Sequence, residues 1–242
     1  LPNKTLVSLL MKNLNRDNWL SSIISKSAYR LEKVNTGYNY SFLGYEDSFI
    51  DTKISTNNIS EINEIQKNGF ELIECELSFK KSNNFFQKEY NSNVIIRLSK
   101  KRDESEIREI ASKSFIQSRF YKDPNFDKKT ASKIKEEWAA NFFKGARGDH
   151  LIVAEKNNSV IGFLLILIKK NNLIIDLIAV DEKNRGLGIA KSMILFAEKN
   201  LMNDLRSVLV GTQLSNLSAI NLYNSLGFQL ISSNYAFHLH IK

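Results

Sequence analysis

The stretch that most constrains the fold of this chain is LIIDLIAVDEKNRGLGIA, residues 173–190. Its first half is apolar apart from Asp176 and predicts a buried strand, and residues 181–184 have turn chemistry. Apolar residues then recur at helical spacing to about residue 201. A strand, a glycine-bearing turn and a helix start together predict an anion site. Glycines let a ligand approach the backbone, and the free N–H groups of a first helical turn point at it.

Two common glycine motifs do not fit this turn. A P-loop would need glycine at positions 185 and 190, and a dinucleotide-binding turn beginning at Gly186 would need a small residue where Lys191 stands. The pattern that fits is R-x-x-G-x-A, which resembles the coenzyme A pyrophosphate loop of the GCN5-related N-acetyltransferase family. The resemblance implies that acetyl-CoA is the co-substrate and that its pyrophosphate binds the backbone of Arg185, Gly186, Leu187, Gly188, Ile189 and Ala190.

A second pattern, N-x-x-A-x-x-L-Y-x-x-x-G-F, covers residues 216–228. From the residues alone, this is an apolar helix stripe in which Tyr223 is a packed aromatic side chain. In the same family a tyrosine at this position protonates the departing thiolate, so the resemblance implies that Tyr223 is the general acid. Asn216 is expected to cap the helix or to contact the coenzyme.

A closer resemblance, to the sugar-nucleotide branch typified by TDP-fucosamine acetyltransferase, rests on segments such as SRFYKDPNF and EEWAANFFKG. It implies direct transfer of an acetyl group to the primary amine of a nucleotide-linked amino sugar of the dTDP-4-amino-4,6-dideoxyhexose type, with no metal. Aromatic and charged residues mix in the first segment, which suits stacking on a sugar ring and pairing with phosphate. The expected substrate-binding residues are Arg119, Tyr121, Asp123 and Asn125. The alternative is a rigid loop whose aromatic side chains pack onto the core.

The resemblance also implies that the strand before the turn bulges. Backbone amides near Ile178, Ala179 and Val180 would then polarise the thioester carbonyl and bind the pantetheine arm. Strand alternation predicts Asp176 on the same face as Ile178 and Val180, and this makes it a candidate general base. The alternatives are that Asp176 pairs with a neighbouring side chain and that a chain of waters takes the proton.

From residue 94 onward the predicted order is β-α-α-β-β-β-α-β-α-β-β, a mixed α/β sheet. This is the order of the acetyltransferase fold, whose sheet splays between its fourth and fifth strands. We expect this domain to span residues 93–242. Residues 1–92 are expected to form a smaller α/β domain, with helices over 6–31, a strand over 38–45, a helix over 58–68 and a strand over 70–79. We see no catalytic constellation in this part, and we expect Asp51, His238 and His240 at the surface.

Charge and composition exclude several classes of protein. The net charge of +8 arises beyond residue 95, where the anion site also lies, and no basic block or motif indicates nucleic-acid binding. The chain has one cysteine, no apolar run long enough to span a membrane and no secretory signal, so a cytoplasmic location is expected. A homodimer is compatible with the sequence. Rival functions are acetylation of a protein N-terminus or an aminoglycoside, and a non-catalytic acyl-CoA-binding module.

Overall fold

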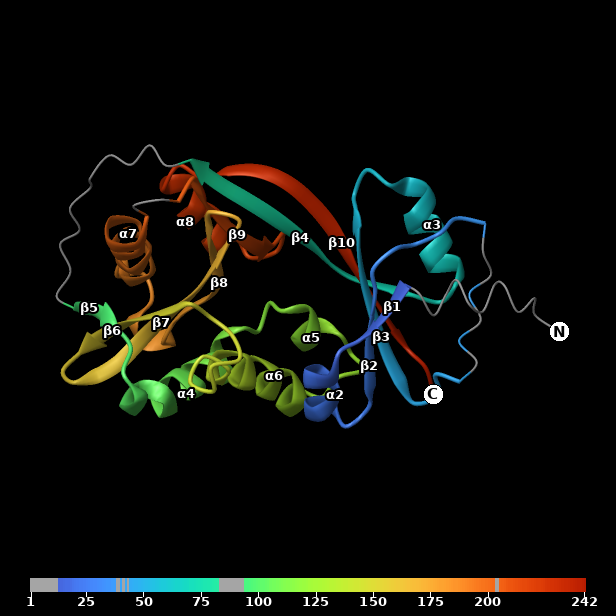
Figure 1. The fold of residues 1–242 in the computed structure, drawn as a ribbon, viewed down its shortest axis with the longest axis horizontal. Helices are drawn as coiled ribbons and strands as arrows, with labels where there is room; N and C mark the ends of the chain where they lie inside the picture. Colours follow the sequence, from blue (N-terminus) through green and yellow to red (C-terminus); the bar gives the residue numbers. More distant parts are fainter. Residues whose placement is uncertain (1–12, 38–39, 41, 43, 83–93, 203–204) are drawn as a thin grey trace.

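The computed structural model describes residues 13–37, 40, 42, 44–82, 94–202 and 205–242. Its centre is one ten-stranded sheet in the order β1-β2-β3-β10-β4-β9-β8-β7-β6-β5 (Figure 1). The strands are β1 (Leu14–Arg16), β2 (Ser27–Leu31), β3 (Ser48–Ser55), β4 (Glu71–Ser82), β5 (Ile95–Leu98), β6 (His150–Lys156), β7 (Ser159–Lys169), β8 (Asn172–Val180), β9 (Ser207–Gln213) and β10 (Gln229–His240).

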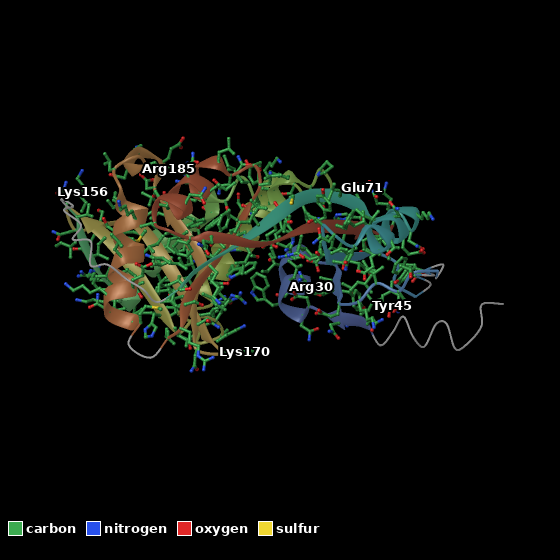
Figure 2. All side chains as sticks on the ribbon, turned by 90° about the horizontal axis from the view of Figure 1, so that it is seen from above. Arg30, Tyr45, Glu71, Lys156, Lys170 and Arg185 are labelled. Carbon is green, nitrogen blue, oxygen red and sulfur yellow. The ribbon has the colours of Figure 1, made fainter. Side chains whose placement is uncertain are left out.

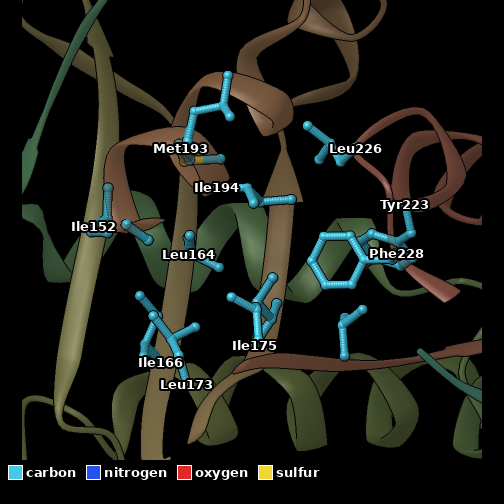
Figure 3. Packing of buried hydrophobic residues seen from close by; sticks show 14 of the residues in the cluster. Ile152, Leu164, Ile166, Leu173, Ile175, Met193, Ile194, Tyr223, Leu226 and Phe228 are labelled. Atoms are coloured by element: carbon cyan, nitrogen blue, oxygen red, sulfur yellow. The ribbon is translucent and has the colours of Figure 1, made fainter. Parts of the chain in front are cut away.

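Helices cover both faces of this sheet. One face carries α2 (Asn18–Ile24), α4 (Glu104–Ser114), α5 (Arg119–Lys122) and α6 (Lys128–Ala140). The other carries α3 (Ile59–Lys67), α7 (Ile189–Leu201) and α8 (Leu217–Ser225). The largest buried cluster lies between the sheet and α7 and α8, and it includes Leu164, Ile175, Met193, Tyr223 and Phe228 (Figure 3). No helix among the described residues is long and apolar enough to cross a membrane.

The placement of β4 differs from the expected order. After α8 the structure has one continuous strand, β10, where two were expected, and β4 pairs with both β9 and β10. Residues 229–240 contain no glycine or proline, so nothing breaks the extended chain in two. The strand between β9 and β10 therefore comes from the first part of the sequence. The proposed domain boundary at 92/93 falls within residues 83–93, outside the described residues, and the sheet itself is continuous across the two parts.

From α3 onward the remaining elements agree with expectation, except that the segment expected as a loop contains α5, and the elements before α3 differ. Helix α3, strand β4 and the Asn157–Asn158 turn between β6 and β7 form as predicted, and both turn residues have positive φ. Residues 27–31, expected to be helical, form β2, whose Ala28 and Leu31 are buried in two different hydrophobic clusters. Of the strand expected at 38–45, residues 38, 39, 41 and 43 lie outside the described part, and the strand that forms is β3.

Candidate active site

The turn after β8 has the geometry of an anion site. Gly186 and Gly188 have φ angles of +79° and +74°, in the left-handed region that favours glycine. A Cβ at either position would meet no protein atom within 4 Å. The first helical bond of α7 runs from the Ser192 N–H to the Gly188 carbonyl at 2.9 Å, so earlier N–H groups have no helical partner. These features fit a pyrophosphate at residues 185–190.

Arg185 adds positive charge beside this turn. Its side chain is exposed, and Figure 2 shows it at the surface by the start of α7. Its Nε donates to the Val180 carbonyl at 3.1 Å, which ties the turn to the end of β8. Leu187 is 62% exposed, so it is open to a ligand instead of being packed in the core. The loop therefore presents both backbone donors and a cation to solvent.

Strands β8 and β9 separate just before this turn. Their parallel pairing ends at Ile175 and Val210, although β8 continues to Val180. This agrees with the splay between the fourth and fifth strands that the resemblance implied. In a strand that pairs on one side only, alternate N–H groups turn toward the unpaired side. The Asp181 N–H bonds to the Ile161 carbonyl at 2.8 Å, so by alternation the Ala179 N–H also points toward β7, and those of Ile178 and Val180 point toward the unpaired side. Contact of these backbone groups with acetyl-CoA stays a prediction.

A bulge at Asp176 changes the face on which the following residues lie. Leu165 pairs with Leu177 and Ile166 with Ile175, so Asp176 is the extra residue in β8. Ile178 and Val180 then pack on the α7 side of the sheet. The prediction that Asp176 shares their face was wrong, because strict alternation does not continue through a bulge.

The carboxylate of Asp176 instead points toward α6 and the loop after it. Arg147 donates to its two oxygens from Nη2 and Nε, each at 2.6 Å, and Trp138 Nε1 donates at 2.8 Å. This bidentate pair and the indole bond occupy the oxygens that a general base would need. The arrangement favours the alternative in which Asp176 pairs with neighbouring side chains and shapes the site.

Tyr223 lies on the opposite face, within the cluster below α7 and α8 (Figure 3). Its ring packs against Phe79 and Phe228, with centroids 5.9 and 5.6 Å away, and the residue is 2% exposed. Burial raises the pKa of Tyr223, so the hydroxyl keeps its proton at neutral pH. The same shift makes the phenol a weaker proton donor, and the general-acid role of Tyr223 stays a prediction.

Asn216 caps α8. Its side-chain oxygen accepts from the Ala219 N–H at 3.3 Å and from the Ser218 hydroxyl at 3.0 Å. This cap explains the asparagine by itself. Contact with the coenzyme stays a prediction.

The segment expected to bind substrate forms α5 and the turn after it. Phe120 and Phe126 are buried against Phe49, which agrees with the alternative in which the aromatic side chains pack onto the core. Tyr121 is half-buried under the ammonium of Lys128, 4.3 Å from its ring, and Asn125 is exposed. The segment is thus held as a rigid scaffold.

Asp123 does not face a ligand, so its predicted substrate contact is corrected. The residue is fully buried, and its Oδ2 bonds to His238 Nδ1 at 2.7 Å and to His240 Nε2 at 2.8 Å. Burial lowers the pKa of His238, so the ring is neutral and donates from Nδ1. The two histidines were expected at the surface, and His238 is only 1% exposed. Because side chains alternate along a strand, the sequence predicts that His238 and His240 share one face of β10. It does not predict that α5 covers this face.

These three side chains also form a cluster that could hold a metal ion, since their ligand atoms lie within 4.8 Å of one another. Their mutual hydrogen bonds satisfy the carboxylate without an ion. The expectation that the reaction uses no metal remains a prediction.

Arg119 is directed into the protein, where it meets the first part of the chain. Its Nη2 lies 2.7 Å from Oδ2 of Asp51, which also pairs with Arg30. Asp51 is 4% exposed, so its expected surface position was wrong. Burial alone would raise the pKa of Asp51, but the two guanidinium groups hold it below its ordinary value.

Glu74 is a functional candidate that the sequence did not reveal. It lies on β4, on the face opposite Leu77 and Phe79, and is 9% exposed. Its Oε2 is buried without a hydrogen-bond partner among the described residues. Burial raises its pKa to about 7, and nearby Arg119 offsets part of this effect. A carboxyl group that titrates near neutral pH and has a free oxygen is suited to accept a proton.

The chemistry of the site thus divides between the two faces of the sheet. The anion loop and Tyr223 lie on the α7 side, and Glu74 lies on the α6 side. Strands β8 and β9 no longer pair beyond Ile175 and Val210, and β4 is the next strand beyond β9.

A coenzyme loop, a splayed mixed sheet and the two sequence motifs define a member of the acyltransferases. Residues 106–228, slightly more than half of the chain, match the Acetyltransferase (GNAT) family, and the chain belongs to this family. This confirms the family and fold expected from the sequence.

Known relatives agree with this assignment. The spore coat polysaccharide biosynthesis protein SpsD of Bacillus subtilis is 37% identical over 138 residues, which are 57% of this chain and 47% of that protein. A GCN5-related N-acetyltransferase from Sphaerobacter thermophilus has a TM-score of 0.58 at 14% identity. The match covers 81% of this chain and 61% of that protein's chain. A conserved protein of unknown function from Staphylococcus epidermidis has a TM-score of 0.64 at 13% identity. The match covers 90% of this chain and 85% of that protein's chain. This chain spans about half the length of SpsD. The two solved structures have the same fold as this chain.

Proposed function

We propose that this protein transfers an acetyl group from acetyl-CoA to the primary amine of a nucleotide-linked amino sugar. The observation that carries the proposal is the position of Glu74, a buried carboxyl group with an unpaired oxygen, on the face of the sheet opposite the turn at residues 185–190, where β8 and β9 cease to pair. The similarity to SpsD, a polysaccharide biosynthesis protein, supports an acceptor that is a sugar precursor.

The residues of the chain would act in a fixed order. The backbone of residues 185–190, with Arg185, would hold the pyrophosphate of acetyl-CoA, which supplies an activated acetyl group. Free N–H groups near Ile178 would polarise the thioester carbonyl at the opening.

On the acceptor side, Glu74 would remove a proton from the ammonium group so that the amine nitrogen can attack the carbonyl carbon. On the coenzyme side, Tyr223 would protonate the sulfur as the carbon–sulfur bond breaks. Asp176 would keep Trp138 and Arg147 in place beside the acceptor. We also propose the cytoplasmic location and the homodimer that were expected from the sequence.

A thiol-release assay tests this function. Acetyl-CoA is offered with dTDP- and UDP-linked amino sugars, with peptide amines and with an aminoglycoside. Turnover with an amino-sugar nucleotide is the expected result. Turnover only with peptides or the aminoglycoside would change the substrate class, and binding of acetyl-CoA without any turnover would favour the non-catalytic module.

A further inference from the structure

Gly211 on β9 is a glycine that the chain's own structure does not require. Its φ angle lies outside the left-handed region, and its pairing with β4 continues without a register shift. A Cβ at this position would lie 3.4 Å from Glu76 Oε1 and 3.8 Å from the Leu77 carbonyl oxygen, which are ordinary contacts. A glycine inside a strand weakens it, and where neither a bulge nor crowding explains the glycine, the remaining reason is close approach of a ligand.

The position of Gly211 in the sheet is that of an acceptor site. Its neighbour Val210 is the last residue of β9 that pairs with β8, so Gly211 is the first residue beside the gap. Ser78 lies opposite it on β4, and the next residue of β4, Leu77, packs on the side of α7 and α8. Because side chains alternate along a strand, Ser78 and Gly211 belong to the opposite face, which is also the face of Glu74.

The side chains around Gly211 offer neutral hydrogen-bonding groups. Gln213 and Asn234 lie on either side of Glu76, in register with it, and with Ser78 they are half-buried. In the part of the chain that the structure describes, these three side chains have no hydrogen-bond partner. The charge of Glu76 is compensated by Lys53. Neutral groups that donate and accept are suited to the hydroxyl groups of a sugar.

We propose that the sugar ring of the acceptor lies on Gly211, where the missing side chain makes room for it, and that Ser78 and Gln213 bond to its hydroxyl groups. The inference rests on the proposed function and identifies the residue that limits the size of the acceptor. The turn at residues 185–190 lies on the other face of the sheet, so a change at Gly211 should affect the acceptor and spare the coenzyme.

A series of side chains at position 211 tests the space above the strand. Gly211→Ala and Gly211→Val should raise the acceptor KM progressively, valine by about 5- to 100-fold, as when methyl groups are forced into a packed contact. The KM of acetyl-CoA should not change. Both variants should melt at the wild-type temperature or above it, because alanine and valine favour a strand more than glycine does. An acceptor KM that is the same in wild type and both variants overturns the proposal.

Ser55→Val is the matched control for added bulk. Ser55 lies on the same face of the sheet, opposite Asn234, but on β3, which is three strands away from β9. This variant should keep the acceptor KM of wild type. A rise as large as that of Gly211→Val would show that bulk anywhere on this face disturbs the protein, and would overturn the role of Gly211.

The hydroxyl contacts are tested by binding without turnover. Protein saturated with coenzyme A is titrated by calorimetry with a dTDP-linked 4-amino-4,6-dideoxyhexose and, separately, with dTDP. Gln213→Leu should weaken binding of the sugar nucleotide roughly 3- to 10-fold, as for loss of one neutral hydrogen bond, and leave binding of dTDP unchanged. Equal weakening for the two ligands would place the nucleotide at this position and overturn the assignment to the sugar.

The two proposals fail in different ways. Turnover of an aminoglycoside alone, with a KM raised by Gly211→Val, keeps the sugar subsite and refutes the proposed function. Turnover of the sugar nucleotide with a KM that Gly211→Val leaves unchanged supports the proposed function and refutes the subsite. Turnover of peptide amines alone, or of no acceptor, refutes both.

Discussion

Nη2 of Arg119 lies 2.7 Å from Oδ2 of Asp51, and this ion pair joins α5 to β3. Asp51 also binds Arg30, so one buried carboxylate compensates two guanidinium groups. The pair fixes the direction of Arg119 and keeps its charge near Glu74. The first part of the chain thus contributes directly to the acceptor side of the site.

Asp51→Asn should lower the free energy of unfolding by about 3–5 kcal/mol, because it leaves two part-buried cations without their carboxylate. Chemical denaturation measures this change. The control is Asp47→Asn, whose partner Lys26 and own side chain are exposed, and which should change stability by about 1 kcal/mol or less. Equal changes in the free energy of unfolding for the two substitutions would show that the buried Asp51 ion pairs stabilise the protein no more than an exposed pair does.

Activity should rise with pH through about 7, because Glu74 must lose its proton before it can act as a base. Glu74→Gln should remove this rise and lower kcat/KM about 100- to 10,000-fold. The pH profile of kcat/KM is the measurement. Glu76→Gln, on the same strand face but paired with Lys53, should keep the rise. A rise that persists in Glu74→Gln would assign the base elsewhere.

Stability should change with pH in the opposite sense. The pKa of Glu74 is about 7 in the folded protein and 4.5 ordinarily, so the folded state holds its proton more tightly than the unfolded state. Its contribution to stability is full below pH 4.5 and is lost as the pH rises through about 7. Relative to Glu74→Gln, wild type should therefore lose stability over this range. Parallel stability curves for the two proteins would contradict the raised pKa.

Tyr223→Phe should reduce kcat roughly 10- to 1,000-fold while acetyl-CoA binding changes little, because only the proton donor is lost. Rapid-mixing kinetics and calorimetry measure the two quantities. Tyr235→Phe, in the cluster beneath α3, is the control for loss of a hydroxyl elsewhere. Unchanged turnover in Tyr223→Phe would leave Tyr223 as a packing residue.

Gly188→Asp should abolish coenzyme binding, since a carboxylate would occupy the anion position and repel the pyrophosphate. Calorimetry with coenzyme A measures the affinity. Gly145→Asp is a matched control: Gly145 has a φ of +67° and no atom within 4 Å of an added Cβ, so it has the same backbone strain at a distant position. Normal affinity in Gly188→Asp would refute the loop assignment.

Asp176→Asn should keep the rise of activity near pH 7 and cost far less turnover than Glu74→Gln, because Asp176 holds Trp138 and Arg147 and takes no proton. A pH profile compared with that of wild type measures this. Loss of the rise in Asp176→Asn would restore the original assignment of Asp176 as base.

The sequence predicts those parts of the site that depend on local chemistry. The turn at residues 185–190 needs glycine where φ is positive and free N–H groups where a helix begins, and Asn216 caps the helix it precedes. Both are short-range requirements, so a pattern of a few residues contains them. Hydrophobic periodicity likewise predicts most elements from residue 58 onward, because one face of each packs on the sheet.

The acceptor side depends on contacts between distant residues. On β4 the acids Glu74 and Glu76 alternate with apolar Cys75 and Leu77, a pattern that a strand with one face in water would also have. Asp51 and His238 are polar residues that are buried, and His240 is half-buried, because the segment around α5 covers their face. The bulge at Asp176 is set by pairing with β7 and turns Ile178 and Val180 to the face opposite the expected base.

By itself, the sequence determined the family, the glycine turn at residues 185–190 and most strands and helices from residue 58 onward, since each follows from neighbouring residues. Only the tertiary structure decided which carboxylate remains unpaired, because it inserts β4 between β9 and β10 and thereby places Glu74 under α5 and α6. Burial and the nearby cations then set its protonation, and these arise from segments far apart in the chain.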